Sequence, residues 1–596
     1  MRLVDAVLVA ALSLTACAVS VPEYAAPRSA VSVPEYAAPS SATWLDQGWQ
    51  PDQRSWYHAA DQGTLTFGIP AEFFTALEQP EPSLSGGQML ADPAYLDRFG
   101  FIASPTGLPV GFAGAPGAVK PDTLEPWLNP RDDKPFASLG LSCAACHTGR
   151  LTYQGRELLI DGGGALISLS QFSKALGLSM AATEFNPLRW RRFADRVIGA
   201  DAPPAADAAL HAQLKTALGR LAWQKDQDIA TAKKTPPVEE GFGRLDALNR
   251  IGNVVFAVTT RQAENYVAIT APVNFPHIWS APWFDWVQYN GSIEQPMVRN
   301  AGEALGVSAP VVFTRDGAKP VYSSAMKPHT IHAMEQLLAG PQPKGSFGGL
   351  RSPAWPEHVL GAIDKKLAAR GEALYAANCQ GCHLPSPRSP AFWDAQYWAP
   401  IQGGQRVLKL RLVPIAVVGT DAAQAADMKA RNVTPRPELG IKSTSFGPAL
   451  GELVANTMTH WYDNQTPKPG AARRAELDGF RANGIRAELA YKARPLNGIW
   501  ATGPFLHNGS VPTLYALLSP LAERPVRFHL GNREFDPVDV GYRTAPIGGD
   551  FQLDTAIRGN SNSGHVFDDG PRGGGIIGRR LAPEERRALV EFLKTL

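Results

Sequence analysis

Two short stretches, Cys143-Ala-Ala-Cys146-His147 and Cys379-Gln-Gly-Cys382-His383, decide what this chain folds around. Each is a Cys-x-x-Cys-His string, the attachment motif of c-type haem. In this motif the two thiols add across the haem vinyl groups, and the adjacent histidine becomes the proximal ligand of the iron. The sequence therefore predicts two covalently bound haems, with His147 and His383 as their proximal ligands, and with them electron transfer or redox catalysis.

Cysteine usage supports this interpretation. The chain has five cysteines, and four of them belong to the two motifs, so we expect no structural disulfide in the body of the protein. An alternative interpretation joins the two Cys-x-x-Cys pairs in a single four-thiolate zinc site. That alternative does not explain why a histidine follows each pair directly.

The N-terminus indicates export. An apolar run from Ala6 to Ala16 has the length of the hydrophobic part of a signal peptide and is too short to span a bilayer. The run closes with Leu14-Thr15-Ala16-Cys17, which resembles a bacterial lipobox with Cys17 as the lipidated residue. An ordinary secretory signal, cut nearby, fits the same run. Both versions predict a periplasmic, outer-membrane-anchored or secreted protein whose only membrane attachment is a lipid.

The chain after this signal divides into a tether and two haem domains. The string VSVPEYAAP occurs at 19–27 and again at 31–39, which predicts an extended Pro-rich tether over residues 18–43. Because the two haem motifs lie far apart, we expect one cytochrome c-like domain for each. The Pro- and Gly-rich passage at 340–356 is typical of a linker. The predicted domains are therefore 44–345, with haem 1 and a long insertion, and 346–596, with haem 2.

The predicted fold class is mainly α, with long loop-rich insertions. In residues 166–232, apolar positions recur among polar ones at helical spacing. The stretch KKLAARGEALYAAN forms a helix that runs into the second haem motif, and LAPEERRALVEFLKTL forms a terminal helix that packs across it. We therefore expect the second domain to be complete at Leu596. The 56 glycines and 51 prolines predict many loops, and the net charge of +2 implies no nucleic-acid partner.

One further stretch carries a family resemblance. Residues 493–518 read ARPLNGIWATGPFLHNGSVPTLYALL and resemble the segment LRN-x-x-LTAPYFHDGSVPTL-x-x-A of bacterial di-haem cytochrome c peroxidases. The chain departs from that pattern at Gly503 and Leu506, where peroxidases have Ala and an aromatic residue. The matching positions are Arg494, Thr502, Pro504, His507, Gly509 and the run Ser510–Leu514.

The resemblance implies two c-type cytochrome domains, a haem in each, and often a calcium ion between them. The same superfamily includes the MauG enzyme, which matures tryptophan tryptophylquinone, and the RoxA-type rubber oxygenases. This chain is most similar to the RoxA-type branch, although it is shorter than a typical rubber oxygenase. The shared strings are EFFTALEQP, FDWVQYNGSIEQP, REFDPVDVG and GNSNSGHVF.

The sixth ligands of the two irons decide function, because a haem with an open position binds O2 or H2O2 whereas a six-coordinate haem carries electrons. For haem 2 the RoxA-type resemblance implies His565, in the loop GNSNSGH before the terminal helix. Met458 is the rival, since peroxidases of the family often use a methionine at the electron-transfer haem. The family pattern makes His507 a residue of a loop near the domain interface, structural rather than ligating.

Haem 1 has no obvious sixth ligand in the sequence, and the resemblance implies that it is the reactive haem. Phe275 and Trp279, in an aromatic-rich stretch, are the predicted walls of its apolar pocket, with ordinary core packing as the alternative. The resemblance also carries the oxygen ligands of the calcium ion to Thr502 and to the carbonyl of Pro504, which suits a hard cation. The alternative there is a haem-edge loop without an ion.

Three functions are compatible with these features. A peroxidase would reduce H2O2 at haem 1 with electrons passed through haem 2 from a small cytochrome or cupredoxin, and would need polar acid–base groups over haem 1. An oxygenase would bind O2 at haem 1 and cleave an apolar polyene such as polyisoprene in a dry aromatic pocket. A plain electron-transfer cytochrome would have two six-coordinate irons. Peroxidase-type chemistry is the first prediction.

Overall fold

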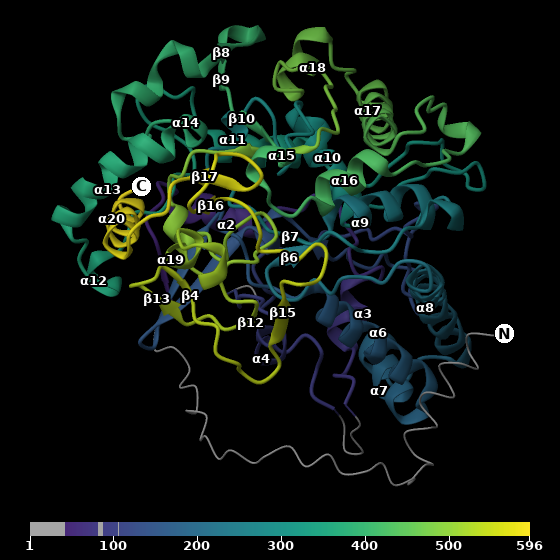
Figure 1. The fold of residues 1–596 in the computed structure, drawn as a ribbon. Coiled ribbons are helices and arrows are strands. Elements are labelled where there is room, and N and C mark those ends of the chain that lie inside the picture. The colour runs from purple at the N-terminus through teal and green to yellow at the C-terminus, as the bar shows by residue number, and fades with distance from the viewer. Residues whose placement is uncertain (1–41, 82–86, 105–106) are drawn as a thin grey trace, which may run out of the picture.

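The computed structural model describes residues 42–81, 87–104 and 107–596. The predicted signal peptide with Cys17 lies outside the described residues, as does the predicted tether apart from Ala42 and Thr43, which begin strand β1 (Ala42–Trp44). Within the described residues, no helix is both long and apolar enough to cross a membrane. Figure 1 shows helices around the outside of the molecule and short strands and long loops between them.

Helices carry most of the regular structure, in agreement with the mainly α prediction. The helix Ala247–Asn253 continues directly into a short π-helix at Val254–Val258. The α-helices are α2 (Pro51–Ala59), α3 (Ala71–Ala76), α4 (Pro93–Asp97), α5 (Cys143–Cys146), α6 (Leu169–Phe185), α7 (Pro187–Ile198), α8 (Pro204–Ala232), α9 (Ala247–Asn253), α10 (Pro296–Gly306), α11 (Pro328–Ala339), α12 (Glu357–Leu360), α13 (Lys365–Asn378), α14 (Gln380–His383), α15 (Ile415–Val418), α16 (Ala423–Ala430), α17 (Phe446–Asp463), α18 (Ala471–Leu477), α19 (Leu514–Leu517) and α20 (Pro583–Lys594).

The strands are short and pair locally. The largest described sheet has three strands in the order β1-β5-β4, and β4 and β5 are joined by a tight turn in which Gln154 and Gly155 both have positive φ. The other strands form two-stranded pairs. The strands after β1 are β2 (Phe112–Ala113), β3 (Gly140–Leu141), β4 (Thr148–Tyr153), β5 (Arg156–Asp161), β6 (Arg244–Leu245), β7 (Val273–Asn274), β8 (Trp398–Pro400), β9 (Arg406–Leu408), β10 (Arg411–Pro414), β11 (Ala490–Ala493), β12 (Arg527–Leu530), β13 (Phe535–Asp536), β14 (Gly541–Tyr542), β15 (Phe551–Asp554), β16 (Val566–Phe567) and β17 (Ile576–Gly578).

The terminal helix packs across the helix that leads into the second motif, as the sequence predicted. Helices α13 and α20 cross closely (Figure 1). The crossing depends on Gly371, because a Cβ there would lie 2.0 Å from the carbonyl oxygen of Ala588. Tyr375 and Phe592 pack beside it with ring centres 5.2 Å apart. The predicted packing of these two helices is confirmed.

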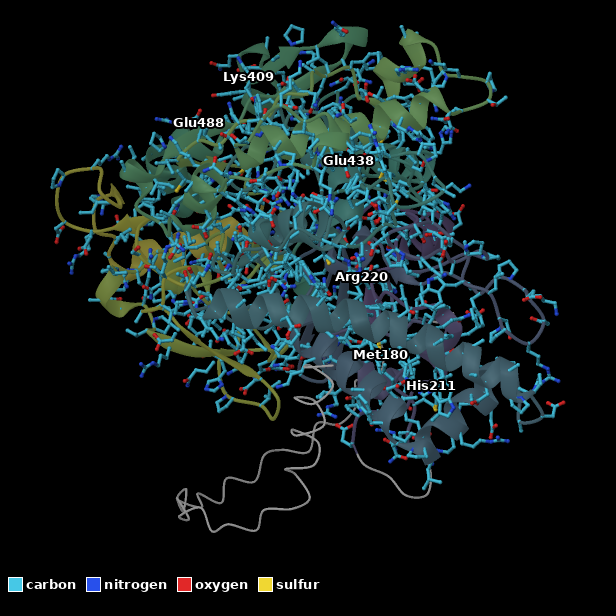
Figure 2. The ribbon with its side chains drawn as sticks, turned by 90° about the vertical axis from the view of Figure 1, so that its right-hand side faces the viewer. Met180, His211, Arg220, Lys409, Glu438 and Glu488 are labelled. Atoms are coloured by element: carbon cyan, nitrogen blue, oxygen red, sulfur yellow. The ribbon has the colours of Figure 1, made fainter. Side chains whose placement is uncertain are left out.

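The helical spacing at 166–232 is also confirmed, since it becomes α6, α7 and α8. Figure 2 shows these helices as a layer on the outside of the molecule, with Met180, His211 and Arg220 on it. Asn186 caps α7 by accepting hydrogen bonds from the backbone N–H groups of Leu188 and Arg189, at 3.0 and 3.1 Å. The layer covers the aromatic core built around Phe172 and Phe193.

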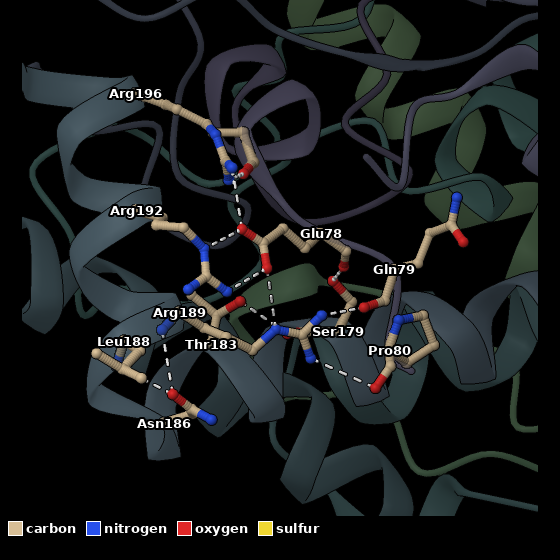
Figure 3. A network of polar contacts seen from close by, with 11 residues as sticks. Glu78, Gln79, Pro80, Ser179, Thr183, Asn186, Leu188, Arg189, Arg192 and Arg196 are labelled. Atoms are coloured by element: carbon tan, nitrogen blue, oxygen red, sulfur yellow. Dashed lines mark hydrogen bonds and ion pairs between the residues drawn. The ribbon is translucent and has the colours of Figure 1, made fainter. Parts of the chain in front are cut away.

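A buried ion network fastens α7 to the segment that follows α3. Glu78 is 2% exposed and accepts hydrogen bonds from Arg192 at 2.7 Å and from Arg196 at 2.9 Å (Figure 3). Arg189 reaches the same carboxylate at 3.4 Å. The hydrogen bond from Arg192 is the main reason why the pKa of Glu78 falls to about 2. One carboxylate therefore holds three guanidinium groups of a single helix.

The two halves of the chain share their hydrophobic cores. One buried cluster runs from Leu45 to Leu596 and includes Leu350 and Trp355, which lie in the predicted linker passage. A second cluster joins residues of α9 and α10 to residues of α16 and α17. The predicted boundary between 345 and 346 is thus crossed by continuous packing. Cys143 and Cys379, the first cysteines of the two motifs, both pack against the first cluster.

Candidate haem sites

The first motif forms the short helix α5 between strands β3 and β4. Gln62 binds Cys143 twice: its amide nitrogen lies 3.1 Å from the sulfur, and its carbonyl oxygen accepts the backbone N–H at 3.1 Å. His147 follows at the start of the β4–β5 hairpin. Its Nδ1 lies 2.7 Å from the carbonyl oxygen of Pro276, and burial lowers the pKa of the imidazole to about 4. The ring is therefore neutral, with its proton on Nδ1 and a free lone pair on Nε2.

The second motif is built in the same way from different elements. Helix α13 ends at the motif, and α14 carries Cys382 and His383. Nδ1 of His383 lies 2.8 Å from the carbonyl oxygen of Arg494. This carbonyl is in place because β11, which ends at Ala493, pairs with β10 next to the motif. A backbone carbonyl that accepts the Nδ1 proton orients each histidine as a metal ligand through Nε2.

The structure places His565 opposite His383. The two ring centres are 6.1 Å apart. Two iron–nitrogen bonds of about 2 Å, placed in line between two imidazoles, separate the ring centres by about 6 Å, so this spacing fits an iron held by both histidines. Burial is the main cause that lowers the pKa of His565, to about 3, which keeps it neutral. Met458, on α17, lies instead in a separate hydrophobic cluster that also contains Phe446 and Leu453.

None of the four motif cysteines forms a disulfide, so all four are available for haem attachment. Burial raises the pKa of Cys143 and of Cys146 to about 12, and that of Cys379 to about 12, so the thiol forms are strongly favoured. Over the part of the chain that the structure describes, no group of three or more His, Cys, Asp or Glu side chains is arranged to hold a metal ion. The described structure thus does not bring the two Cys-x-x-Cys pairs together, as a four-thiolate zinc site would require.

Polar residues gather beside the first motif, and the sequence analysis did not single them out. Glu303 on α10 accepts a hydrogen bond from the side chain of Gln288 at 3.0 Å. Glu303 itself is exposed, yet the density of protein around the carboxyl raises its pKa. Glu303 in turn raises the pKa of Cys143 and Cys146, and at Cys143 only burial has a larger effect, so Glu303 lies close to the first motif.

The neighbours of Glu303 form an ion pair of their own. Arg299, also on α10, lies 2.6 Å from Glu335 on α11, and both are buried. Arg299 counteracts the rise in the pKa of Glu303, whereas Glu335 adds to it. Two carboxylates, Glu303 and Glu335, therefore share one guanidinium. Because Arg299 pairs with Glu335, the Glu303 carboxyl is left to exchange protons.

Two further basic residues, Lys492 and Arg494, follow in strand β11 and just after it. Burial lowers the pKa of Lys492 well below its ordinary value and that of Arg494 to about 10. Lys492 donates to the carbonyl oxygen of Gln288, and the Arg494 guanidinium lies 5.2 Å above the ring of Phe284. Within the described residues, Nε of Arg494 is buried without a hydrogen-bond partner, and neither side chain has a carboxylate at ion-pair distance. Such cations fit a group that carries negative carboxylates, as haem does through its propionates.

Phe275 and Trp279 lie near the first motif, in two different environments. Phe275 belongs to the cluster that also contains Ala145 and packs against Cys146. Trp279 is completely buried and donates its indole N–H to the carbonyl oxygen of Asn497 at 2.8 Å. His277 stacks on Trp279 with ring centres 4.5 Å apart, and in the described structure its buried Nε2 has no partner. Trp279 is therefore a well-anchored core residue next to the haem 1 region.

The predicted calcium ligands lie together but already have protein partners. The carbonyl oxygen of Pro504 accepts a hydrogen bond from Asn274 at 2.6 Å, and the Thr502 hydroxyl donates to the carbonyl oxygen of Ile499 at 2.9 Å. Oδ1 of Asn274 is buried and, among the described residues, unpartnered. His507 stacks on Tyr491 at 4.1 Å, in agreement with a structural role.

Comparison with known proteins identifies a family match and two similar proteins. Residues 490–529, which include Arg494, match a family described as RoxA-like, cytochrome c-like. A protein of Sinorhizobium fredii named "Uncharacterized protein y4iJ" is 53% identical over 547 residues, which cover 91% of each chain. A second protein of the same organism, "Uncharacterized protein y4iM", is 26% identical over 384 residues, or 62% of this chain and 74% of that one.

Proposed function

The chain belongs to the same family as y4iJ and carries a RoxA-like, cytochrome c-like segment, and from this premise we propose that it is an exported di-haem c-type oxidoreductase that reduces peroxide at haem 1. His383 and His565 would hold haem 2, which would supply electron transfer to haem 1. The electrons come from a small cytochrome or cupredoxin outside the cytoplasm. The export part of the proposal rests on the N-terminal apolar run and its lipobox-like end.

The observation that carries the peroxidase assignment is Glu303, a carboxyl with a raised pKa beside Cys143 and hydrogen-bonded to Gln288. When bound, haem c supplies an iron that accepts peroxide oxygen and electrons. Reduction of H2O2 to two waters consumes two electrons and two protons. The Glu303 carboxylate takes the proton from the first peroxide oxygen and returns it to the departing one, while the Gln288 amide holds the carboxylate in position.

The basic residues Lys492 and Arg494 have a separate role in the proposal. Lys492 and Arg494 are half-buried and have no carboxylate partners among the described residues, so they are suited to neutralise haem propionates. The Arg494 carbonyl also orients His383. One residue thus contributes to both sites, which suits transfer of electrons from haem 2 to haem 1.

Glu303→Gln is the variant that tests the assignment. It keeps the shape of the side chain and its contact with Gln288 but removes the proton acceptor. We expect kcat/KM for H2O2, measured with a reduced small cytochrome as donor, to fall by about 10²-fold or more. Haem content and the low-spin EPR signal of haem 2 should stay as in the parent protein.

Glu184→Gln is the matched control. Glu184 is likewise a helix carboxyl with a polar partner, His211 at 2.8 Å, but it lies on the outer helix α6. This variant should keep its full peroxidase rate. If Glu303→Gln turns over peroxide as fast as Glu184→Gln does, Glu303 is not the acid–base group. If CO fails to bind the reduced parent protein, both haems are closed and the electron-transfer function replaces the peroxidase.

A second candidate is oxidative cleavage of an apolar polyene. It is favoured by the RoxA-like match and by the place of Phe275 in the apolar cluster against which Cys146 packs. In that case the protein would consume O2 with a polyisoprene or carotenoid-like substrate, without an added donor, and give carbonyl-ended fragments. Phe275→Ala should then reduce O2 consumption, because the substrate loses an apolar contact, and should affect peroxide turnover much less.

A further inference from the structure

Arg524 makes four hydrogen bonds, and three of them hold the loop that ends in His565. Its guanidinium donates to the carbonyl oxygens of Asn562 at 2.6 Å, of Gly564 at 2.8 Å and of His565 itself at 2.8 Å. The fourth bond reaches the carbonyl oxygen of Leu517, at the end of α19, at 3.0 Å. One side chain thus ties the loop of the haem 2 ligand to a helix.

The hydrogen bonds to this loop explain why the Arg524 cation is buried. Arg524 is 3% exposed, and over residues 42–81, 87–104 and 107–596 it has no carboxylate at ion-pair distance. A buried charge without a counter-ion costs several kcal/mol unless its hydrogen bonds repay the lost hydration. At Arg524 the lost hydration is offset by hydrogen bonds to carbonyl oxygens, and three of the four belong to the loop that ends in His565. The buried charge therefore fixes the geometry of that loop.

The loop needs such fixing because its backbone is strained. His565 has a φ of 48°, in the left-handed region that non-glycine residues seldom adopt. Gly564, just before it, packs so closely that a Cβ would lie 2.1 Å from the carbonyl carbon of Gly419. The backbone N–H of His565 donates to the carbonyl oxygen of Val418 at 2.7 Å. The Arg524 bond to the His565 carbonyl holds the other side of the same residue.

We propose that Arg524 is the positioning residue of haem 2: it holds His565 on the axis of His383 and, through its uncompensated charge, raises the reduction potential of that haem. The inference rests on the proposed ligation of haem 2 by His565. An axial ligand must be held within about 0.5 Å of its bonding position to stay bound. A cation near the iron favours the ferrous over the ferric state, so its removal lowers the potential.

The experiment compares Arg524→Met and Arg524→Lys with a matched control in the haem-loaded full-length protein. Arg431 is the control because it is also buried, and its guanidinium also binds only neutral oxygens: those of Asn249, Asn253 and Asn265. Unlike Arg524, it contacts no residue of the His565 loop. His565→Ala is included as a separate arm. The readouts are the low-spin EPR signal, the reduction potential of each haem, and the number of CO molecules bound per reduced protein.

Arg524→Met should split or weaken the low-spin signal of haem 2, lower the potential of that haem alone, and raise CO binding from one toward two per protein. Arg524→Lys should disturb the ligand but keep most of the potential, because the charge remains. Arg431→Met should change none of the three readouts. Equal behaviour of Arg524→Met and Arg431→Met, or an unaltered haem 2 in Arg524→Met, overturns the inference. If His565→Ala itself leaves the low-spin signal intact, the proposed ligation fails and the inference fails with it.

Discussion

Glu78→Gln should loosen helix α7 without touching either haem site. The Glu78 carboxylate is the only acid that the structure places among Arg189, Arg192 and Arg196 at ion-pair distance within the described chain (Figure 3). Glutamine keeps the size of the side chain but cannot balance three guanidinium groups. The variant leaves a buried, unbalanced positive charge, because Arg189 is only 4% exposed.

The expected size of the effect follows from the pKa. A carboxyl pKa of about 2 instead of 4.5 corresponds to about 3 kcal/mol, at 1.36 kcal/mol for each tenfold change in proton affinity. Arg192 and Arg196 are 25% and 33% exposed, so solvent screens part of this interaction. We therefore expect a loss of about 2 kcal/mol, which is about a 30-fold increase in local opening.

The assay is amide hydrogen exchange of α7, which reports local opening in a chain too large for a simple two-state unfolding measurement. Because the folded pKa of Glu78 is below the unfolded one, its contribution is complete above about pH 4.5 and is lost as the pH falls toward 2. The difference between Glu78→Gln and the parent should therefore shrink over that range. Glu81→Gln is the control: Glu81 is 57% exposed, lies 3.8 Å from Arg98 and should change nothing. Unaltered exchange of α7 in Glu78→Gln, or a difference that does not depend on pH, would refute the reasoning.

Three further outcomes are expected. Changing Cys143 and Cys146 to Ala should remove one of two haem masses that survive denaturation; zinc in place of haem would end the assignment. Gly371→Ala should destabilise the α13–α20 crossing by at least 1–3 kcal/mol in a thermal melt followed at haem 2, whereas Gly177→Ala, on the open face of α6, should not. If calcium binds at Thr502, metal analysis should find one calcium ion per protein, and its removal by a chelator should change a haem spectrum. If protein prepared in calcium-containing buffer holds no calcium ion, the site is contradicted.

The sequence could predict what is local in this fold. The two motifs are contiguous, and helices α6, α7, α8, α13 and α20 follow from spacing within short windows. The parts that it could not predict depend on distant pairs. The carbonyl groups that orient His147 and His383 come from Pro276 and Arg494, which are 129 and 111 residues away in the chain. A backbone carbonyl has no sequence signature, so only the fold can supply it.

The Glu303–Gln288 pair was missed for a related reason. Glu303 stands in an amphipathic helix, where an isolated carboxylate is usually a residue of the solvated face. What makes it unusual is the approach of Gln288 from a loop and of Glu335 from another helix. The choice between His565 and Met458 was likewise open in the sequence, because both residue types bind haem iron. The 6.1 Å spacing between the His565 and His383 rings favours His565.

The acidity of Glu303 leads to one more test, the dependence of the proposed peroxidase on pH. Burial is the largest cause that raises the pKa of this carboxyl, Glu335 adds to the rise, and Arg299 and Gln288 oppose it. The groups that face it are Cys143, which has no titratable thiol once haem is attached, and the buried Arg299–Glu335 pair. Glu303 is therefore the group that titrates as the pH rises above 4.5.

Only the ionised carboxylate can accept the peroxide proton, so kcat/KM should increase with pH along an acidic limb whose midpoint lies above 4.5. Glu303→Gln should have a low rate that no longer follows this limb, and Glu184→Gln should keep it. The measurement is the pH profile of kcat/KM for H2O2 between about pH 4 and 8 in the three proteins. An acidic limb that survives unchanged in Glu303→Gln would assign the proton transfer to another group and remove the main support for peroxidase chemistry at haem 1.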